Sequence, residues 1–268
     1  MLGEFIASSK GVELMLHYNR AVITGDVHLD PRVPSREIAF CRFLDWVIDY
    51  RPDALFLLGD VFEFWFGYDS IMFSRFLRPV VRLGTIRNLG IEIHYLVGNH
   101  DFLPGRVFSE YLDVHVHNDP IRVLFGETLT YLSHGDEINT EDRGYLFLKS
   151  VLRNSVAQRL FRLIPASIAW HMGRLTSDTS RKYTQHKNEM SPATFDRFAL
   201  DLAEQNVTTI IHGHTHHPMD RVMTYGERRI RHINAGHWFG PGHYVLADSG
   251  AFERSEEHTS ELQSRGLI

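Results

Sequence analysis

Residues 20–28 read RAVITGDVH, an apolar run followed at once by a carboxylate and an imidazole. The run is short and rich in Val and Ile, which favours a buried β-strand over a helix. Asp26 and His28 stand two positions apart, so both side chains point the same way from an extended strand end. This stretch therefore predicts a strand that delivers one oxygen ligand and one nitrogen ligand to a common point.

The same arrangement recurs four times along the chain, where an apolar run again ends in Asp, Asn or His. The five predicted strands are Arg20–Thr24, Ala54–Leu58, Ile91–Val97, Thr128–Ser133 and Val207–Ile211. The blocks after the last four hold Asp60, then Asn99, His100 and Asp101, then His134, and finally His214 and His216.

Helical patterns separate these strands. We predict helices at Ser35–Tyr50, at Met72–Asn88 with an interruption near Pro79, and at Pro192–Gln205. Strands that alternate with helices indicate an α/β layered fold, in which ligands gather beyond the carboxyl ends of the strands. The stretch Asp220–Glu253 alternates in short β-like runs and is expected to be antiparallel.

The chain divides into a core, an insertion and a tail. We assign the core to residues 1–139 and 191–253, and a helical insertion to 140–190, where apolar residues are interleaved with Arg and Lys. Residues 254–268 resemble the translation of a sequencing-library adapter, so we expect a non-native tail and leave it out of the fold prediction. The position of the native C-terminus, and of a final strand, is then open.

Composition fits one large domain, or one domain with an insertion, in 268 residues. The net charge of −5 gives no argument for nucleic-acid binding. The single Cys41 excludes an internal disulfide and fits a reducing compartment. No segment approaches the ~20 apolar residues of a membrane span, and Met1–Asn19 lacks the apolar centre of a signal peptide. We expect a cytoplasmic protein.

The five blocks carry the ligand types of a transition-metal site. A carboxylate such as Asp60 can bridge two cations, and Asn99 adds an oxygen ligand without charge. Singly, such residues are more often helix caps, turns or structural histidines. Together, each after a strand, they predict a site with mixed oxygen and nitrogen ligands, which suits Mn²⁺ and also Fe²⁺, Zn²⁺ or Co²⁺. Two such cations activate a water for in-line attack on phosphorus.

The order D-x-H, G-D, G-N-H-D, H-G and G-H-x-H resembles the calcineurin-like metallophosphoesterase superfamily over residues 20 to about 248. The resemblance implies a four-layer α/β/β/α sandwich with two metals at the strand ends. It implies that His100 protonates the leaving group or stabilises its charge, and that Asp101 orients His100 by accepting its ring proton. The implied ligands are Asp26, His28, Asp60 and His216 for the first metal, and Asp60, Asn99, His134 and His214 for the second.

Longer stretches resemble the UDP-2,3-diacylglucosamine diphosphatases of lipid A biosynthesis. They are LLGDVFEFW at 57–65, GNHDFLPG at 98–105, HGDE at 134–137 and HGHTHHP at 212–218. The resemblance implies cleavage of the diphosphate to UMP and 2,3-diacylglucosamine 1-phosphate, beneath a cap formed by 140–190. Asn99, His100, Asp142 and His214 would contact the substrate, with Ser180, Lys182 and Lys187 as further candidates. The best-known branch of that family has Arg in place of His100.

Alternative functions remain open on the sequence alone. The second hypothesis is a soluble phosphodiesterase or phosphomonoesterase acting on a nucleotide or small phosphoester, and the third is a metal-binding scaffold without catalysis. The insertion between 140 and 190 fits either an acyl-chain slot that contacts the membrane surface or a helical hairpin that packs its own core. A peripheral contact with the inner membrane therefore belongs to the first hypothesis only.

Overall fold

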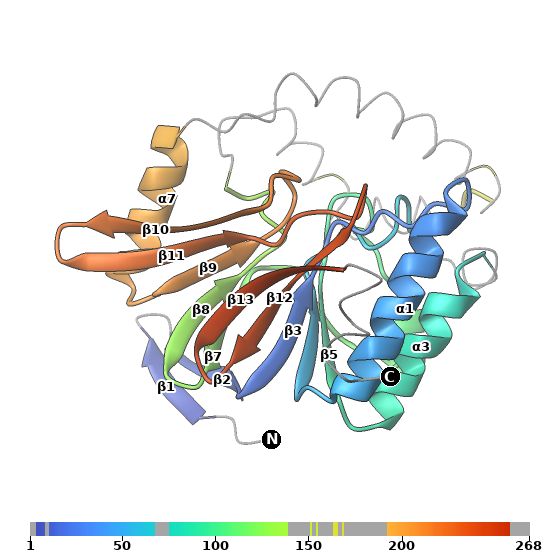
Figure 1. The fold of residues 1–268 in the computed structure, drawn as a ribbon, viewed down its shortest axis with the longest axis horizontal. Coiled ribbons are helices and arrows are strands. Elements are labelled where there is room, and N and C mark those ends of the chain that lie inside the picture. Colours follow the sequence, from blue (N-terminus) through green and yellow to red (C-terminus); the bar gives the residue numbers. More distant parts are fainter. Residues whose placement is uncertain are drawn as a thin grey trace.

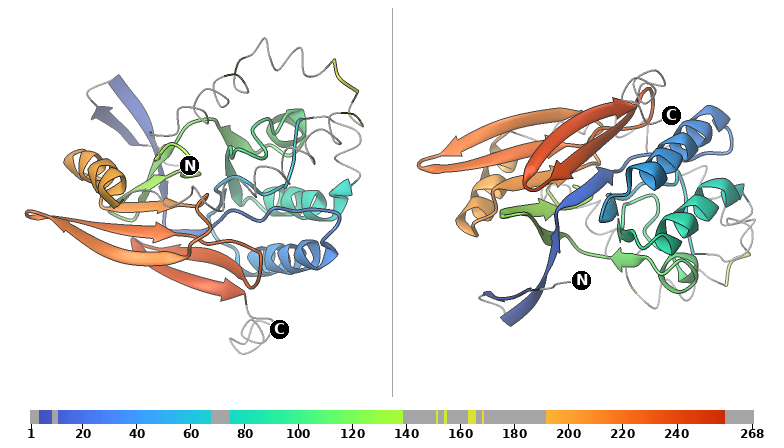
Figure 2. Two further views of the ribbon diagram at one scale, coloured as in Figure 1. Left: turned by 90° about the horizontal axis from the view of Figure 1, so that it is seen from above. Right: turned by 60° about the horizontal axis from the view of Figure 1, so that its bottom comes forward.

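Two β-sheets lie face to face in the computed structural model, with helices on the outer side of each sheet (Figure 1). Figure 2 shows the same layers from above and from below. The structure describes residues 4–8, 11–67, 75–138, 151, 154, 163–165, 168 and 192–257.

The smaller sheet has six strands in the order β13-β12-β3-β4-β5-β6. Its central strands are parallel, and the pairing of Ala21 with Ala54, and of Ala54 with Glu92, sets β3, β4 and β5 side by side. The six strands are β3 (Arg20–Thr24), β4 (Ala54–Leu57), β5 (Glu92–Leu96), β6 (His115–His117), β12 (Gly242–Asp248) and β13 (Ala251–Glu257).

The larger sheet has seven strands in the order β1-β2-β7-β8-β9-β11-β10. In this sheet β8 and β9 are parallel, so their carboxyl ends lie at the same edge. The seven strands are β1 (Glu4–Ser8), β2 (Gly11–Tyr18), β7 (Ile121–Phe125), β8 (Thr128–Leu132), β9 (Thr209–His212), β10 (Met219–Tyr225) and β11 (Arg228–Asn234).

Helices cover both outer faces. α1 (Pro34–Tyr50) and α3 (Leu77–Asn88) pack on the six-stranded sheet, over a core that contains Leu44, Val80 and Ile93. α7 (Pro192–Glu204) packs on the seven-stranded sheet through Phe195 and Ala199. A short helical turn, η1 (Val107–Tyr111), precedes β6.

A third apolar core lies between the two sheets. It contains Ile23 and Phe56 from the smaller sheet and Val123 and Ile211 from the larger one, all fully buried. With helices outside both sheets, this core makes the order of layers α/β/β/α. The fold class predicted from the sequence is therefore confirmed.

Several element boundaries differ from the sequence prediction. The break expected near Pro79 lies earlier, because α3 begins at Leu77 and Pro79 lies in its first turn, where a missing N–H costs no helical hydrogen bond. The antiparallel prediction for Asp220–Glu253 holds for β10 with β11 and for β12 with β13, but β11 pairs with β9 in parallel. Strands β1, β2, β6 and β7 were not predicted.

The insertion and the tail are described only in part. Of the predicted insertion, Ile164 packs against the core under α1 and α3, whereas Asp142, Ser180, Lys182 and Lys187 lie outside the described residues. Strand β13 pairs with β12 as far as Glu257, four residues into the segment that we left out of the fold prediction. Among the described residues, none of the helices is long and apolar enough to cross a membrane.

Candidate metal centre

The polar loops after β3, β4, β8 and β9 are joined to one another by backbone hydrogen bonds. Asp26 N–H donates to the carbonyl of Gly59 at 3.0 Å, and His28 N–H donates to the carbonyl of Asp60 at 2.8 Å. In the other sheet, Gly213 N–H donates to the carbonyl of His134 at 2.9 Å. Between the sheets, His214 N–H donates to Asp26 Oδ2 at 2.7 Å, so the loops that follow strands of both sheets meet at one place.

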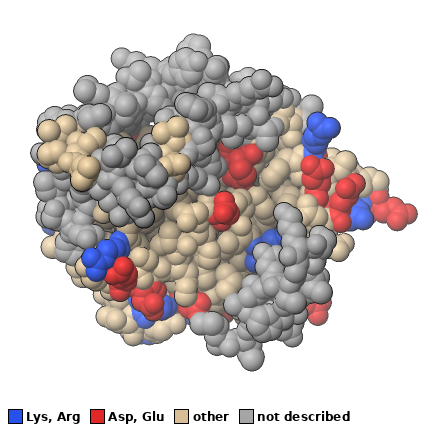
Figure 3. Space-filling model, turned by 180° about the vertical axis from the view of Figure 1, so that it is seen from behind, with Lys and Arg blue, Asp and Glu red and all other residues tan. Residues whose placement is uncertain are grey.

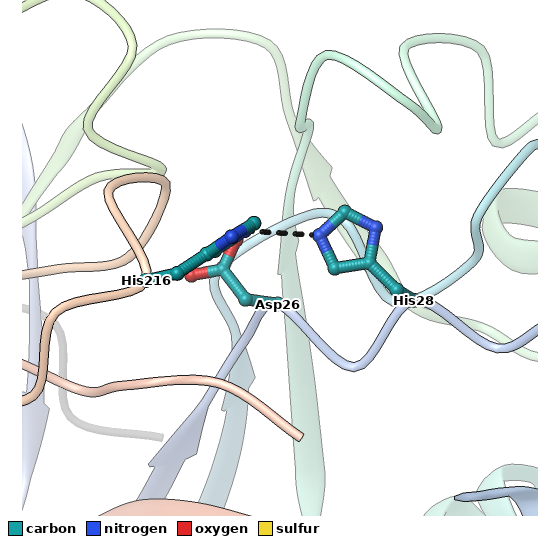
Figure 4. Close-up of side chains that lie close together, drawn as sticks. All are labelled: Asp26, His28 and His216. Carbon is teal, nitrogen blue, oxygen red and sulfur yellow. Dashed lines mark hydrogen bonds and ion pairs between the residues drawn. The ribbon is translucent and has the colours of Figure 1, made fainter. Parts of the chain in front are cut away.

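The predicted ligands of the first metal converge there. His28 Nε2 lies 3.1 Å from His216 Nε2, and His216 Nε2 lies 3.4 Å from Asp26 Oδ1 (Figure 4). Asp60 Oδ2 lies 3.8 Å from His28 Nε2. Asp26, His28 and Asp60 are buried.

The predicted ligands of the second metal form an adjoining group. Asn99 Oδ1 lies 3.0 Å from His134 Nε2 and 3.1 Å from His214 Nδ1. Asp60 Oδ2 lies 3.5 Å from His134 Nε2, so the same carboxylate oxygen faces both groups. The structure thus brings together all seven side chains that the sequence singled out as metal ligands.

The backbone of these loops has an uncommon conformation. Five of the seven predicted ligands have φ between 49° and 69°, in the left-handed region: Asp26, His28, Asp60, His214 and His216. A non-glycine residue there costs about 1–2 kcal/mol, and such residues cluster at functional sites. The conformation turns each side chain out of its strand direction toward the shared point.

Two glycines allow the loops to pack against the carboxylates. A Cβ on Gly98 would lie 2.2 Å from Asp60 Oδ1, and a Cβ on Gly213 would lie 2.3 Å from Asp26 Oδ2. These oxygens also accept backbone hydrogen bonds, Asp60 Oδ1 from His100 N–H at 2.8 Å and Asp26 Oδ2 from His214 N–H at 2.7 Å. Each Asp therefore uses one oxygen to hold a loop and turns the other toward the ligand group.

Groups outside the set of predicted ligands orient the imidazole rings. His134 Nδ1 lies 2.8 Å from the carbonyl of Leu58. Because a carbonyl only accepts, Nδ1 carries a proton, and Nε2 is turned toward Asp60. His28 Nδ1 lies 3.2 Å from Glu63 Oε2, which acts on the first group in the same way. Sequence reasoning missed Glu63, although a carboxylate three residues after Asp60 was a visible signal.

The electrostatics favour added positive charge. Burial opposes ionisation of Asp26, but the neighbouring His216 and His134 hold its pKa well below the usual value. Burial also lowers the pKa of His134, but the carboxylates of Asp60 and Asp26 outweigh that effect and raise it to about 9. Burial and the nearby His134 lower the pKa of His214 to about 4. The carboxylates of Asp60 and Asp26 therefore stabilise positive charge on the ring of His134, at the place where a cation would bind.

Asp101 does not have the role that the sequence suggested. We expected its carboxylate to accept the ring proton of His100. Instead the carboxylate accepts from the backbone N–H groups of Asp60 at 3.0 Å, Val61 at 2.7 Å and Gly98 at 3.1 Å, and from the Tyr95 hydroxyl. Asp101 is fully buried, and with Phe62 N–H at 3.3 Å five donors occupy its oxygens. It fixes the loops that carry Asp60 and Asn99.

His100 lies beside the first ligand group and has another partner. Its ring centroid is 4.9 Å from that of His28, and its Nδ1 lies 3.0 Å from the carbonyl of Glu63. By the same reasoning as for His134, Nδ1 carries a proton and Nε2 is left for other partners. His28, Asp60 and His100 also each offer a ligand atom within 4.8 Å of the others.

The residues present fit divalent metal ions. Among the described residues, the buried oxygen Asp26 Oδ1 accepts no well-aligned hydrogen bond, which leaves a charged acceptor to be neutralised. Imidazole nitrogens and carboxylate oxygens without a thiolate are a donor set for Mn²⁺, Fe²⁺, Zn²⁺ or Co²⁺. Every group of three or more candidate ligand residues found among the described residues belongs to this centre.

The family model and the curated relatives agree with this chemistry. The family model for calcineurin-like phosphoesterases matches residues 20–218. A UDP-2,3-diacylglucosamine hydrolase from Azotobacter vinelandii is 32% identical over 233 residues, 86% of this chain and 95% of the relative. One from Pseudomonas entomophila is 31% identical over 87% of this chain and 96% of the relative. A solved dimetal phosphatase from Danio rerio is 11% identical with a TM-score of 0.49, covering 89% of this chain and 96% of that one. The chain belongs to the calcineurin-like phosphoesterase family and is a metal-dependent phosphoester hydrolase.

Proposed function

We propose that this protein cleaves the diphosphate of UDP-2,3-diacylglucosamine, giving UMP and 2,3-diacylglucosamine 1-phosphate, a step of lipid A biosynthesis. The observation that carries the proposal is the similarity to hydrolases named for this substrate, at 32% and 31% identity over 86% and 87% of the chain. The similarity therefore extends beyond the metal-ligand motifs to most of the core and the insertion.

The proposed metal content is two Mn²⁺ ions, held by the two groups that share Asp60. Asp26, His28, Asp60 and His216 would hold one ion, and Asp60, Asn99, His134 and His214 the other. Such a pair, when bound, lowers the pKa of a water and stabilises charge on the phosphoryl oxygens. The spacing supports this assignment, since Asp60 Oδ2 faces both His28 and His134.

His100 is the proposed acid for the leaving group. Because its Nδ1–H is directed at the Glu63 carbonyl, Nε2 is the atom that would exchange a proton with the leaving oxygen. The hydrogen bond to a carbonyl fixes the ring without taking up Nε2. Asp101 acts through the loops rather than on His100, so we treat it as a positioning residue.

Asn99, His100 and His214 border the centre and are the described part of the proposed substrate contacts. Asp142, the fourth, lies outside the described residues. The substrate carries acyl chains, so we further propose a cytoplasmic protein that contacts the inner membrane peripherally.

A nucleic-acid substrate is not part of the proposal. On the face drawn in Figure 3, the described Asp and Glu side chains lie among the Lys and Arg. Individual cations pair with carboxylates, as in the contact of Arg231 with Asp220 at 2.7 Å. A surface that binds the phosphate backbone of a nucleic acid needs clustered cations instead.

The alternative is a phosphodiesterase or phosphomonoesterase acting on a soluble nucleotide or small phosphoester. His100 favours this alternative, because His is the residue of the general superfamily pattern at this position.

The test is release of UMP from UDP-2,3-diacylglucosamine by the Mn²⁺-loaded protein, measured beside hydrolysis of bis-p-nitrophenyl phosphate. We expect UMP from the acylated substrate and none from UDP-N-acetylglucosamine. Hydrolysis of the generic ester without UMP release would reject the lipid substrate and leave the alternative. Activity on neither would indicate a scaffold.

A further inference from the structure

Phe239 is an exposed aromatic residue that borders the candidate metal centre. It lies in the loop between β11 and β12, and 45% of its surface is exposed. Its ring centroid is 5.3 Å from that of His28 and 5.0 Å from that of His216, two proposed ligands of the first metal. The role proposed for the centre does not use this ring.

The loop holds Phe239 in a fixed place. The preceding residue, Trp238, is buried, its Nε1–H donates to Thr24 Oγ1 at 3.1 Å, and its backbone N–H donates to the carbonyl of Asp26 at 3.2 Å. A Cβ on Gly242 would lie 2.4 Å from the Trp238 ring, so the loop is closely packed on that side. With Trp238 anchored inward, the next side chain is presented outward at the edge of the centre.

At the start of the same loop, the side chain of Asn234, the last residue of β11, is tied to the metal-ligand loop as well. Asn234 Nδ2 donates to the carbonyl of Gly213 at 3.0 Å and to Thr215 Oγ1 at 2.9 Å. Gly236 N–H donates to Asn234 Oδ1 at 2.9 Å. Because Gly213 and Thr215 flank the proposed ligand His214, the ring of Phe239 and the metal ligands keep a constant relative position.

The neighbours of the ring are flat and polar. Besides His28 and His216, the ring of His237 lies 5.2 Å away, and the guanidinium of Arg36 lies 4.8 Å from the ring centroid. Imidazole and guanidinium groups around a phenyl ring favour a planar partner that carries polar edges, whereas an acyl chain is better matched by aliphatic side chains. His28 is stacked on the ring at an interplanar angle of 24° and Arg36 lies over it, so a planar partner would use the part of Phe239 that these two groups leave exposed.

We propose that Phe239 is the stacking surface for the nucleobase of the substrate. The inference rests on the proposed function, in which the diphosphate carries a nucleoside on one side. In a nucleotide only a ribose separates the base from its phosphate, so an aromatic surface directly beside a phosphate-binding metal centre is suited to the base. Stacking on an aromatic side chain is sequence-tolerant, because every base has a π-face.

The test measures binding of UMP and of inorganic phosphate to the Mn²⁺-loaded protein by calorimetry. Phe239→Leu keeps an apolar side chain but removes the π-face, and we expect UMP to bind about 10-fold more weakly, with phosphate affinity unchanged. Phe239→Trp should keep UMP affinity within about 3-fold of wild type. Tyr111→Leu is the matched control, since Tyr111 is 62% exposed with Arg106 over its ring at 5.4 Å but lies outside the centre.

Three results of the UMP and phosphate measurements would overturn the inference. They are equal UMP affinity in Phe239→Leu and wild type, an equal loss of UMP and phosphate affinity, and a wild-type protein that binds UMP no more tightly than phosphate. A loss confined to 2,3-diacylglucosamine 1-phosphate would also overturn it and assign the ring to an acyl chain. Failure of the proposed function is seen separately, as absent UMP release by wild type, because the binding measurement does not depend on turnover.

Discussion

Buried histidines occur in two regions of this molecule, and their surroundings differ. At the metal centre, His134 lies 3.5 Å from Asp60, and the nearby carboxylates raise its pKa to about 9. On β5, His94 is stacked on Phe56 with ring centroids 4.7 Å apart, and its Nδ1 lies 2.9 Å from His117 Nε2. Burial and the neighbouring imidazoles lower the pKa of His94 to about 3.

The difference shows what separates a ligand group from a packed core. Glu92 lies 3.6 Å from His94 Nε2, but the Tyr18 hydroxyl bonds to both groups and satisfies them. At the metal centre, Asp26 and Asp60 each keep one oxygen directed at imidazole nitrogens. Burial of several histidines is therefore insufficient for a cation site, which also needs carboxylate oxygens directed at the imidazoles.

The largest effect is expected from Asp60, because its carboxylate faces both ligand groups. Asp60→Asn removes the charge that both ions would share, so we predict a loss of about 10³-fold or more in kcat/KM. Metal content measured by mass spectrometry should fall below that of wild type. The matched change in the other region, His94→Gln, should leave the metal content unchanged. A full metal complement in Asp60→Asn would remove the distinction between the two regions.

His100 gives the next largest effect. His100→Ala removes the proposed proton donor but no proposed ligand, so we predict a loss of about 10²-fold in kcat with metal content retained. The control is His115→Ala. His115 lies on β6, where its ring stacks on that of His94, and this variant should keep wild-type kcat. Turnover near wild type in His100→Ala would show that this imidazole only shapes the loop.

Gly213 tests the packing of a loop on Asp26. In Gly213→Ala the new methyl group would lie 2.3 Å from Asp26 Oδ2, so the carboxylate must move. We predict Mn²⁺ affinity lower by about 10-fold to 100-fold, the range for disturbing the support of a ligand. Gly240→Ala is matched to it, since nothing lies within 4 Å of its added Cβ. Equal Mn²⁺ affinities in the two variants, measured by calorimetry, would contradict the packing argument.

The smallest effect, taken per pH unit, is a pH dependence of metal binding. With its pKa raised to about 9, His134 is protonated at neutral pH, and a metal ion must displace that proton. The apparent Mn²⁺ affinity should therefore rise between pH 6 and pH 9, by at most about 10-fold per pH unit for one proton. His94, with a pKa of about 3, is neutral throughout this range, so His94→Gln should leave the slope unchanged. A flat profile in wild type would mean that His134 carries no displaceable proton.

Much of this site could be predicted from the sequence because its signals are local. A short apolar run followed by Asp or His marks a strand and its carboxyl end, and β3 begins and ends where it was expected, at Arg20 and Thr24. Parallel strands place such ends at one edge, so the ligands converge without further information. A layered α/β fold followed from the alternation of strands and helices, whereas the four-layer order was implied by the family resemblance.

Other features depended on contacts that the sequence does not display. The alternation of Val12, Leu14 and Leu16 was a weak signal for β2, and the three-residue β6 gave too little pattern to read. Adjacency in the chain suggested that Asp101 orients His100. The fold instead turns the carboxylate toward backbone N–H groups and places the Glu63 carbonyl beside His100. Which oxygen meets which nitrogen is decided by loops that are distant in sequence.

The most direct test of the account is anomalous diffraction from crystals of the Mn²⁺-loaded protein. We expect two peaks, one among Asp26, His28 and His216 and one among Asn99, His134 and His214, with Asp60 between them. We expect no peak beside His94 and His117. A single peak, no peak at this centre, or a peak beside His94 and His117 would contradict the claim that the carboxylates select the metal site.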